Sequence, residues 1–241
     1  RQRQMCIRDS VWDDHDYGME NGDYTFAAKQ DAIQAFKEYY PTPDLPNGDE
    51  GIWHSFRFAH SEYFMLDVRS NRDPNTEPDG PEKSLLNGQN IPNGQKEWLF
   101  NGLLNSTARW KFIISGVNFN PTCKPDDSWG GFATEWQEVV DFINDNNITN
   151  VIVLSGDLHS GGGYDDGTNS GVPEISVPHT NMRIRHDATT THPGAWTGGL
   201  ISGVDNPGYV RVSVLTQPHR VVLDIKGADG SIRQSVTLDS Q

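Results

Sequence analysis

Two short segments of the chain combine carboxylates with histidine, the side chains that bind hydrolytic metal ions and transfer protons. The first segment, Trp12-Asp13-Asp14-His15-Asp16, places three carboxylates and one imidazole in four consecutive positions. The second, Ser155-Gly156-Asp157-Leu158-His159, follows the apolar run 151–154. Carboxylate oxygens and imidazole nitrogens on loops at strand ends are typical of a metal-dependent hydrolytic site.

Each segment also has an interpretation without catalysis. Acidic clusters are often solvated turns, Asp157 could cap a helix, and His159 could be a hydrogen-bonded loop histidine. However, the apolar residues Val11 and Trp12 precede the first cluster, which suggests that it too lies at the end of a strand. Two clusters placed in this way favour one shared site.

The composition narrows the class of protein. The chain has 241 residues, enough for one sizeable domain. Its formal net charge is -14, which argues against binding to a nucleic-acid backbone. The charge suits a site loaded with cations, although an ordinary acidic surface explains most of the excess. No apolar run approaches the ~18 residues of a membrane span. The two cysteines, Cys6 and Cys123, form no CxxC pair, so a zinc ribbon is not supported.

The first ten residues, RQRQMCIRDS, have no hydrophobic period, and the sequence becomes patterned only at Val11. We therefore predict residues 1–10 to be a non-native or disordered leader. Residues 11–241 are predicted to form one domain, since no internal repeat and no second domain is evident.

Hydrophobic periodicity predicts an α/β fold. Helices are expected over residues 24–40, 95–104 and 134–144, and strands over residues 52–59, 62–68, 110–115 and 151–154. The strand–helix–strand order from 110 to 154 is typical of a βαβ unit. From residue 208 the pattern predicts antiparallel strands over 208–215, 220–226 and 231–238. The long polar loop 69–92 is more typical of a functional or mobile segment than of filler.

In chain order, several segments resemble the PhoD-like alkaline phosphatases of the metallophosphoesterase superfamily. The matching segments are WDDHD at 12–16, LDVR at 66–69, RDP at 72–74, QKEWL at 95–99, WKFII at 110–114, DSW at 127–129 and SGDLH at 155–159. The resemblance implies a metallophosphoesterase-like αββα sandwich, here partial, that ends in an antiparallel C-terminal hairpin. Its metals would lie at the C-terminal ends of the central strands.

The resemblance also implies a set of metal ligands. Asp13 and Asp14 are expected from the first segment, with Asp14 in the position of the superfamily's asparagine. Asp157 and His159 are expected from the second. Asn118 is a further candidate oxygen ligand, although an ordinary loop asparagine remains an alternative. The family's association with iron and calcium implies Fe³⁺ and Ca²⁺ as cofactors, and an oxygen donor at position 157 suits calcium.

The expected catalytic residues are His15 and Asp16. By resemblance, His15 contacts the phosphate and protonates the leaving oxygen, while Asp16 orients His15. Histidine suits this task because imidazole titrates near neutrality.

Two further residues are candidates for substrate binding. Arg69 could reach the phosphate, or it could form a salt bridge with Asp67 or Asp73. His179, like His192, lies in the irregular stretch 178–207 and could line the pocket, with an ordinary loop position as the alternative.

The reaction implied by the resemblance is metal-dependent hydrolysis of a small phosphoric ester, of the alkaline phosphatase or phosphodiesterase type, by a protein that is monomeric and extracellular or periplasmic. The superfamily's first metal ligands precede the Asp-Asp-His element and have no counterpart before Val11. We therefore expect this chain to correspond to a C-terminal portion and to be weakly active or inactive alone. The alternative is a non-catalytic calcium-binding module of a secreted protein.

Overall fold

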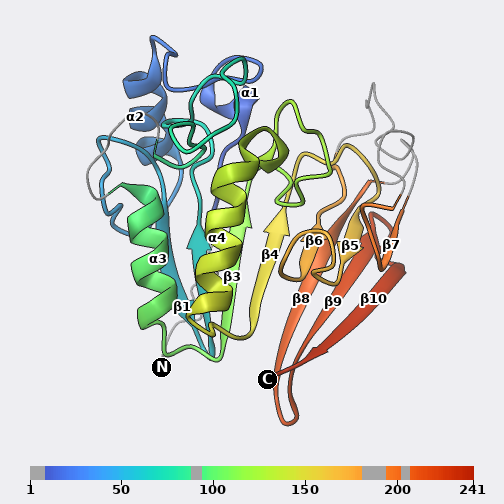
Figure 1. Cartoon of the computed structure of the whole chain (residues 1–241). Helices are drawn as coiled ribbons and strands as arrows, with labels where there is room; N and C mark the ends of the chain where they lie inside the picture. The colour runs from blue at the N-terminus through green and yellow to red at the C-terminus, as the bar shows by residue number, and fades with distance from the viewer. Residues whose placement is uncertain (1–8, 88–93, 181–193, 202–206) are drawn as a thin grey trace.

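The computed structural model of the chain describes residues 9–87, 94–180, 194–201 and 207–241. Within these ranges, a seven-stranded mixed sheet forms the centre of the molecule, in the order β1-β2-β3-β4-β6-β5-β7 (Figure 1). The strands are β1 (His54–Phe58), β2 (Ser61–Met65), β3 (Trp110–Ser115), β4 (Val151–Ser155), β5 (Gly163–Asp165), β6 (Glu174–Ser176) and β7 (Gly199–Leu200).

The strands β2, β3, β4 and β6 run parallel to one another. The β3–β4 pairing extends from Lys111 opposite Val151 to Ser115 opposite Ser155. Both strands are almost continuously apolar because each is covered on both faces, which is typical of a parallel sheet. Since parallel strands end at the same edge, the loops that follow β3 and β4 emerge side by side. The predicted βαβ unit is confirmed.

Helices α3 (Gln95–Asn105) and α4 (Ala133–Asp145) cover one face of this sheet (Figure 1). A short 3-10 helix, η1 (Trp129–Phe132), leads directly into α4. On α4, Val139, Val140 and Ile143 recur at helical spacing and are buried in the same cluster as Ile113 and Val153 of the sheet. This apolar stripe holds the helix between the two parallel strands that it connects.

A second, antiparallel sheet covers part of the opposite face. Its strands are β8 (Gly208–Thr216), β9 (His219–Gly227) and β10 (Ile232–Asp239), in the order β10-β9-β8. Alternate residues of β9, namely Val221, Leu223 and Ile225, are fully buried against Phe112 and Ile175 of the central sheet. The α/β architecture and the antiparallel C-terminal hairpin are confirmed.

Two short helices lie beyond the carboxyl ends of the parallel strands: α1 (Asp14–Tyr17) and α2 (Lys29–Tyr39). The prediction that helix 24–40 begins at Tyr24 is wrong by five residues. Asp23 instead caps a turn, accepting hydrogen bonds from the Thr25 amide (2.9 Å) and hydroxyl (2.6 Å). The Phe26 amide also bonds back to the Asp23 carbonyl, which delays the helix to Lys29.

The expectation that the Asp13–Asp16 cluster follows a strand is also wrong. Residues 9–13 are irregular, and the cluster instead begins α1. The lead-in residue Trp12 is buried against Tyr17 and Phe36, so its apolar character serves the packing of α1 and α2 and not a sheet.

Candidate active site

Three segments that are far apart in the sequence meet at the carboxyl edge of the central sheet. They are the start of α1, the loop after β3 and the loop after β4. The Asn118 side chain donates a hydrogen bond to the Gly156 carbonyl (2.9 Å), which ties the second loop to the third. Arg69, just after β2, donates to Asp13 at 2.6 Å, which ties α1 to the same edge.

Glycines allow these segments to approach closely. A Cβ atom on Gly116 would lie 2.8 Å from the Trp12 carbonyl oxygen, and one on Gly156 would lie 2.7 Å from the Gly116 carbonyl oxygen. Both distances are shorter than real Cβ atoms tolerate. Glycine at these positions therefore brings the backbones after β3 and β4 and before α1 into contact.

Asp67 fixes the chain that leads into the site. Its buried carboxylate accepts hydrogen bonds from the Trp12 indole (2.8 Å), the Ile52 amide (2.9 Å) and the Arg69 amide (3.0 Å). The Gln95 side chain binds both the amide and the carbonyl of Asp67 at 2.7 Å. Because buried polar groups are costly to leave unpaired, this network fixes the backbone position of Arg69.

The Arg69 guanidinium is fully buried and bridges two carboxylates. It binds Asp127 through two parallel hydrogen bonds (3.0 and 3.1 Å) in addition to Asp13. The salt bridge that was the alternative for Arg69 is therefore present, but with Asp13 and Asp127 in place of Asp67 or Asp73, and the role of Arg69 in substrate binding stays a prediction. Sequence separation explains the error, since Asp127 lies 58 residues away. Although burial acts to lower the pKa of Arg69, Asp13 and Asp127 outweigh it and hold that pKa above its ordinary value.

A second buried arginine shares Asp127. The Arg72 guanidinium lies 3.1 Å from Asp127 and over the ring of Phe132. Burial, together with the charge of Arg69, lowers the pKa of Arg72 to about 10. Asp127 thus fixes two arginines, one of which, Arg69, also binds Asp13.

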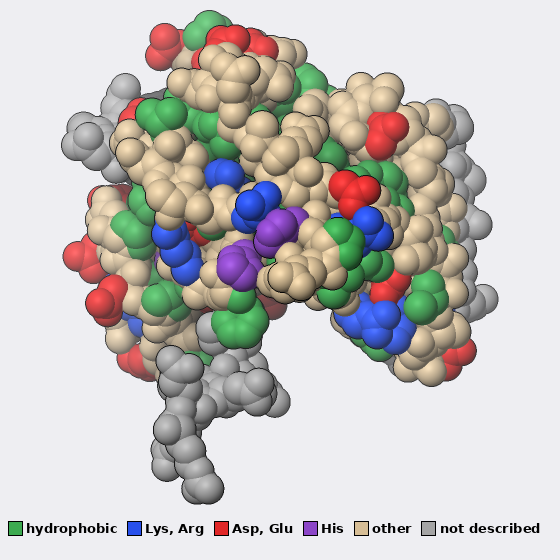
Figure 2. Space-filling view, turned by 90° about the horizontal axis from the view of Figure 1, so that it is seen from below, with side chains coloured by type: hydrophobic (Ala, Val, Ile, Leu, Met, Phe, Trp, Pro, Cys, Tyr) green, Lys and Arg blue, Asp and Glu red, His purple; other side chains and the backbone are tan. Residues whose placement is uncertain are grey.

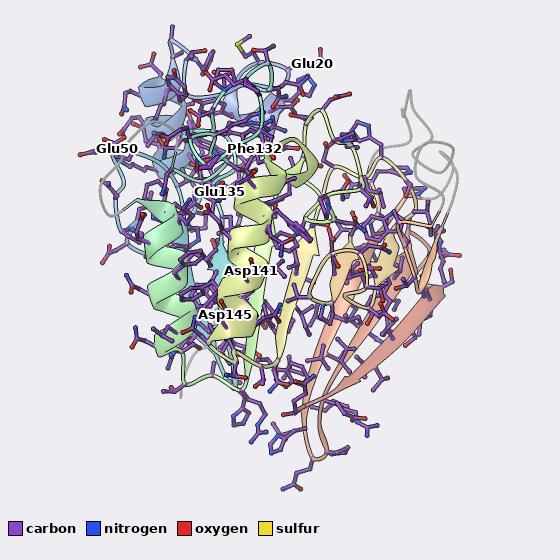
Figure 3. The ribbon with its side chains drawn as sticks, viewed as in Figure 1. Glu20, Glu50, Phe132, Glu135, Asp141 and Asp145 are labelled. Carbon is purple, nitrogen blue, oxygen red and sulfur yellow. The ribbon has the colours of Figure 1, made fainter. Side chains whose placement is uncertain are left out.

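The remainder of the loop after β2 is held by Glu135. Figure 3 shows Glu135 near the upper end of α4, with Asp141 and Asp145 farther down the same helix. The buried Glu135 carboxylate accepts hydrogen bonds from the Ser84 hydroxyl (2.6 Å) and the Leu86 amide (3.2 Å). Burial raises the pKa of Glu135. Residues 84–86 of the loop are therefore held against α4, and residues 88–92 lie outside the described residues.

Asp13 has an unusual electrostatic environment. Burial raises its pKa to about 6, because the charge of Arg69 offsets the desolvation only in part. The nearby negative charge of Asp157 contributes to the same rise. Two carboxylates from different segments therefore repel each other at this edge, which is the arrangement that a bound cation would relieve.

Asp157 is paired with a lysine and a histidine. Its carboxylate binds the Lys124 ammonium and lies 2.8 Å from His159 Nε2. Burial acts to raise the pKa of Asp157, but the hydrogen bonds from His159 and Lys124 outweigh it and keep the pKa low. Asp157 and His159 both have φ of 55°, in the left-handed region that non-glycine residues rarely adopt. No helix follows Asp157 in residues 158–165, so it does not cap one.

The side-chain oxygen of Asn118 differs from the side-chain nitrogen in its hydrogen bonding. The Asn118 side-chain amide donates to the Gly156 carbonyl and the Ser176 hydroxyl, both at 2.9 Å. Its Oδ1 atom is buried and has no hydrogen-bond partner among the residues that the structure describes. Leaving a buried acceptor without a donor is costly, so the Asn118 oxygen is chemically suited to bind a cation or another donor.

The first segment presents its remaining residues on α1. Asp14 accepts hydrogen bonds from the His15 amide (2.7 Å) and the Asn21 amide (3.0 Å). Asp16 accepts from the Asp13 amide at 3.4 Å. His15 is exposed on the same short helix. The structure thus places His15 in the first turn of α1, the helix that Asp13 caps. The roles assigned to His15 and Asp16 stay predictions.

His179 lies next to the loop after β4, because its amide binds the Ser160 carbonyl at 3.1 Å, one residue beyond His159. Its role in substrate binding also stays a prediction. His192 lies outside the described residues.

Sequence reasoning missed three charged residues at this edge: Asp127, Lys124 and Glu174. Glu174 of β6 is fully buried and accepts hydrogen bonds from the Phe119 amide (2.9 Å) and the Ser155 hydroxyl. Burial raises its pKa to about 7. Of these three residues, only Asp127 lies in a segment that resembles the PhoD-like phosphatases, Asp127-Ser128-Trp129.

The donors fit part of a metal site. Among the described residues, no group of three or more His, Cys, Asp or Glu side chains is arranged to hold a metal ion. Asn118 Oδ1 is nevertheless buried and unpartnered among the described residues, and Asp13 and Asp157 add two carboxylates that influence each other electrostatically. Arg69 and Lys124 already form ion pairs with those two carboxylates. The chemistry of the set, oxygen donors with one imidazole, suits a hard cation.

Comparison with solved structures defines the class of fold. The chain is similar to a structure of PhoD, with a TM-score of 0.65 and 23% sequence identity, over 95% of this chain and 51% of that chain. It is also similar to a purple acid phosphatase from yellow lupin (Lupinus luteus) seeds, with a TM-score of 0.50 and 10% identity, over 91% of this chain and 39% of that one. The fold is therefore metallophosphoesterase-like, as predicted.

Sequence comparison defines the family. The family model of the PhoD-like phosphatases matches residues 7–172, well over half of the chain. The chain belongs to the PhoD-like phosphatase family, whose members are phosphatase-type hydrolases. It is 33% identical to alkaline phosphatase D of Bacillus subtilis over 151 residues, which cover 54% of this chain and 25% of that protein. The chain thus spans about a quarter of this relative and about half of the PhoD structure.

Proposed function

We propose that this chain carries part of the active site of a metal-dependent phosphoric ester hydrolase of the alkaline phosphatase or phosphodiesterase type. One observation carries the proposal: the buried Oδ1 of Asn118 has no hydrogen-bond partner among the described residues, and it lies at the sheet edge that also carries Asp13 and Asp157. The family supports a small phosphate ester as the substrate.

The residues divide the work by their chemistry. Asp13, Asp14, Asn118, Asp157 and His159 would hold the metal ions, with calcium and iron as the proposed identities. Bound metal would polarise the phosphate oxygens and acidify water. Arg69 would act by fixing Asp13, because its own guanidinium is buried and already bridges Asp13 and Asp127.

His15 would hold the proton that the leaving oxygen needs. Its position on exposed α1 leaves the imidazole accessible to a substrate at the sheet edge. Asp16 would orient the His15 ring, and His179 would contact the substrate from the loop beside Ser160. These roles follow from the resemblance and are compatible with the positions of the residues.

The setting of the protein is part of the proposal. No helix among the described residues is long and apolar enough to cross a membrane. We propose a monomer that works outside the cytoplasm, as an extracellular or periplasmic protein. Since Asp13 and Asp157 are paired with arginine and lysine, the chain alone is expected to bind metal weakly and to turn over little substrate.

The decisive experiment measures hydrolysis of p-nitrophenyl phosphate and bis-p-nitrophenyl phosphate, with calcium and iron added or removed by a chelator. The assay is made on the chain and on a version extended upstream in its source DNA. Metal-dependent turnover that His15→Ala reduces by about 10²-fold or more would support the proposal.

His219→Ala is the matched control, since His219 is an exposed histidine on β9 at the opposite end of the molecule. It should leave turnover unchanged. Absence of turnover in both proteins, together with a melting temperature that calcium still raises, would instead support a non-catalytic calcium-binding module.

A further inference from the structure

A pocket lies at the end of the central sheet opposite the candidate active site. Figure 1 shows that strands β3 and β4 begin at this end. The volume of the pocket is about 420 Å³. The pocket is lined by Arg57, Ala59, His60, Thr107, Ala108, Arg109, Lys111, Thr149 and Asn150. We refer to this set of residues as the basal pocket.

The basal pocket is basic on a strongly acidic chain. The chain has 33 Asp and Glu against 19 Lys and Arg, yet the lining holds Arg57, Arg109, Lys111 and His60 and no acidic residue. Figure 2, which views this end of the molecule, shows Lys, Arg and His side chains gathered on one face. The His219 ring lies 6.4 Å from the His60 ring and extends this surface. A local concentration of positive charge on an acidic protein attracts an anion to one place.

Lys111 gives the pocket a buried cation. The residue is 7% exposed, and its ammonium donates to the carbonyls of Ala108 (3.1 Å) and Thr149 (3.2 Å). An ammonium has three N–H donors, so these two carbonyls do not exhaust it. Burial lowers the pKa of Lys111, with only partial compensation from Glu62. An anion in the pocket would relieve this cost.

The two arginines differ in how they are held. Arg57 is oriented by Glu62 (2.9 Å) and by the Thr107 hydroxyl (3.0 Å). Arg109 binds the Ser240 hydroxyl at 2.9 Å, a neutral partner that leaves the guanidinium charge uncompensated by that contact. Arg109 is therefore preorganised and still positive, which suits recognition of an oxyanion.

We propose that the basal pocket binds a small oxyanion of the phosphate type through Arg109, Lys111 and Arg57. A phosphate group accepts hydrogen bonds on several oxygens at once, which matches donors that approach from separate elements. A nucleic acid is disfavoured because its backbone needs an extended basic surface, whereas the net charge of this chain is -14. The site is independent of the proposed hydrolase centre at the other edge of the sheet.

The test is a titration of the chain with inorganic phosphate, with a chelator present so that no metal binds, followed by NMR of the backbone amides. Saturable shifts are expected at residues 107–111 and 149–150, with a dissociation constant on the order of 1 mM. Arg109→Gln should weaken binding about tenfold, and Arg109→Lys should restore most of the affinity because it keeps the charge.

Two variants serve as controls. Lys37→Gln removes the same charge from exposed α2 at the far end of the molecule and should leave the affinity unchanged. His15→Ala should also leave it unchanged, which separates this pocket from the candidate active site. Shifts that do not saturate, or an affinity that Arg109→Gln does not alter, would overturn the proposal. Stabilisation of the folded chain by phosphate gives a second measurement if a variant folds poorly.

Discussion

The two ends of the central sheet both gather charge, but they hold it differently. At the carboxyl edge, Arg69 and Arg72 are fully buried and share the carboxylate of Asp127. At the opposite edge, Arg109 is exposed and binds a neutral hydroxyl, while Lys111 binds backbone carbonyls. The arginines of the carboxyl edge are therefore paired with carboxylates, whereas in the basal pocket only Arg57 has such a partner among the described residues, Glu62, and Arg109 and Lys111 bind neutral groups.

This difference separates two uses of a charged residue. A buried ion pair fixes geometry, because each partner needs the other to offset the loss of water. A cation with neutral partners contributes little to folding and remains available to a ligand. Arg69 should therefore act by positioning Asp13, whereas Arg109 should act by direct contact with an anion.

The largest expected effect is the loss of Asp127. Asp127→Ala would leave Arg69 and Arg72 as buried cations without their shared carboxylate, so we expect a loss of about 3–5 kcal/mol in the free energy of unfolding. Urea denaturation measures it. At the other end, Arg109→Gln should change that free energy by less than about 0.5 kcal/mol.

Asp141→Ala is the control for the chemical change, since Asp141 is exposed on α4 and accepts a hydrogen bond from Gln137 in the same helix. It should be nearly neutral. If Asp127→Ala were as mild as Asp141→Ala, the contrast between the two ends of the sheet would be wrong.

Sequence patterns predicted the scaffold well for a physical reason. Strands β3 and β4 and the C-terminal antiparallel strands have apolar periods that arise directly from burial on one face or two. The convergence of Asp13 and Asp157 was predicted as a shared site. Its stated basis was partly wrong, because Val11 and Trp12 form no strand in the structure and Trp12 packs against helix residues.

The charge network could not be predicted in the same way. The choice of Asp127 over Asp67 as the partner of Arg69 depends on a contact across 58 residues, which no local pattern encodes. Glu174 likewise looks like any strand residue until its burial is known. Such long-range pairings decide the pKa values and partners at the site, so they require the fold.

Glu174 is a buried acid that binds an amide and a hydroxyl, so its protonation should make the free energy of unfolding depend on pH. Burial raises its pKa from 4.5 to about 7, so between these values the folded chain holds a proton that the unfolded chain has released. The free energy of unfolding should therefore fall as pH rises through this window, by up to about 1.4 kcal/mol per pH unit. Denaturation at several pH values, with a chelator present, measures the slope.

Glu174→Gln should flatten this slope between pH 6 and 7, where Asp13, with a pKa of about 6, contributes less. Glu38→Gln, an exposed acid on α2, should leave the slope unchanged. A slope that survives in Glu174→Gln would mean that Glu174 is not the group that takes up the proton.

The smallest expected effect concerns Lys124, which occupies the Asp157 carboxylate that a metal would need. Lys124→Met removes a positive charge next to the proposed ligands, so calcium affinity should rise about three- to fivefold, since like unit charges a few ångströms apart in water oppose each other by about 1 kcal/mol. Calorimetric titration with calcium measures the change, and Lys37→Met on α2 should show none. An affinity that falls in Lys124→Met would indicate that the lysine positions Asp157 for the metal, so that the cations at the carboxyl edge support the site and do not compete with it.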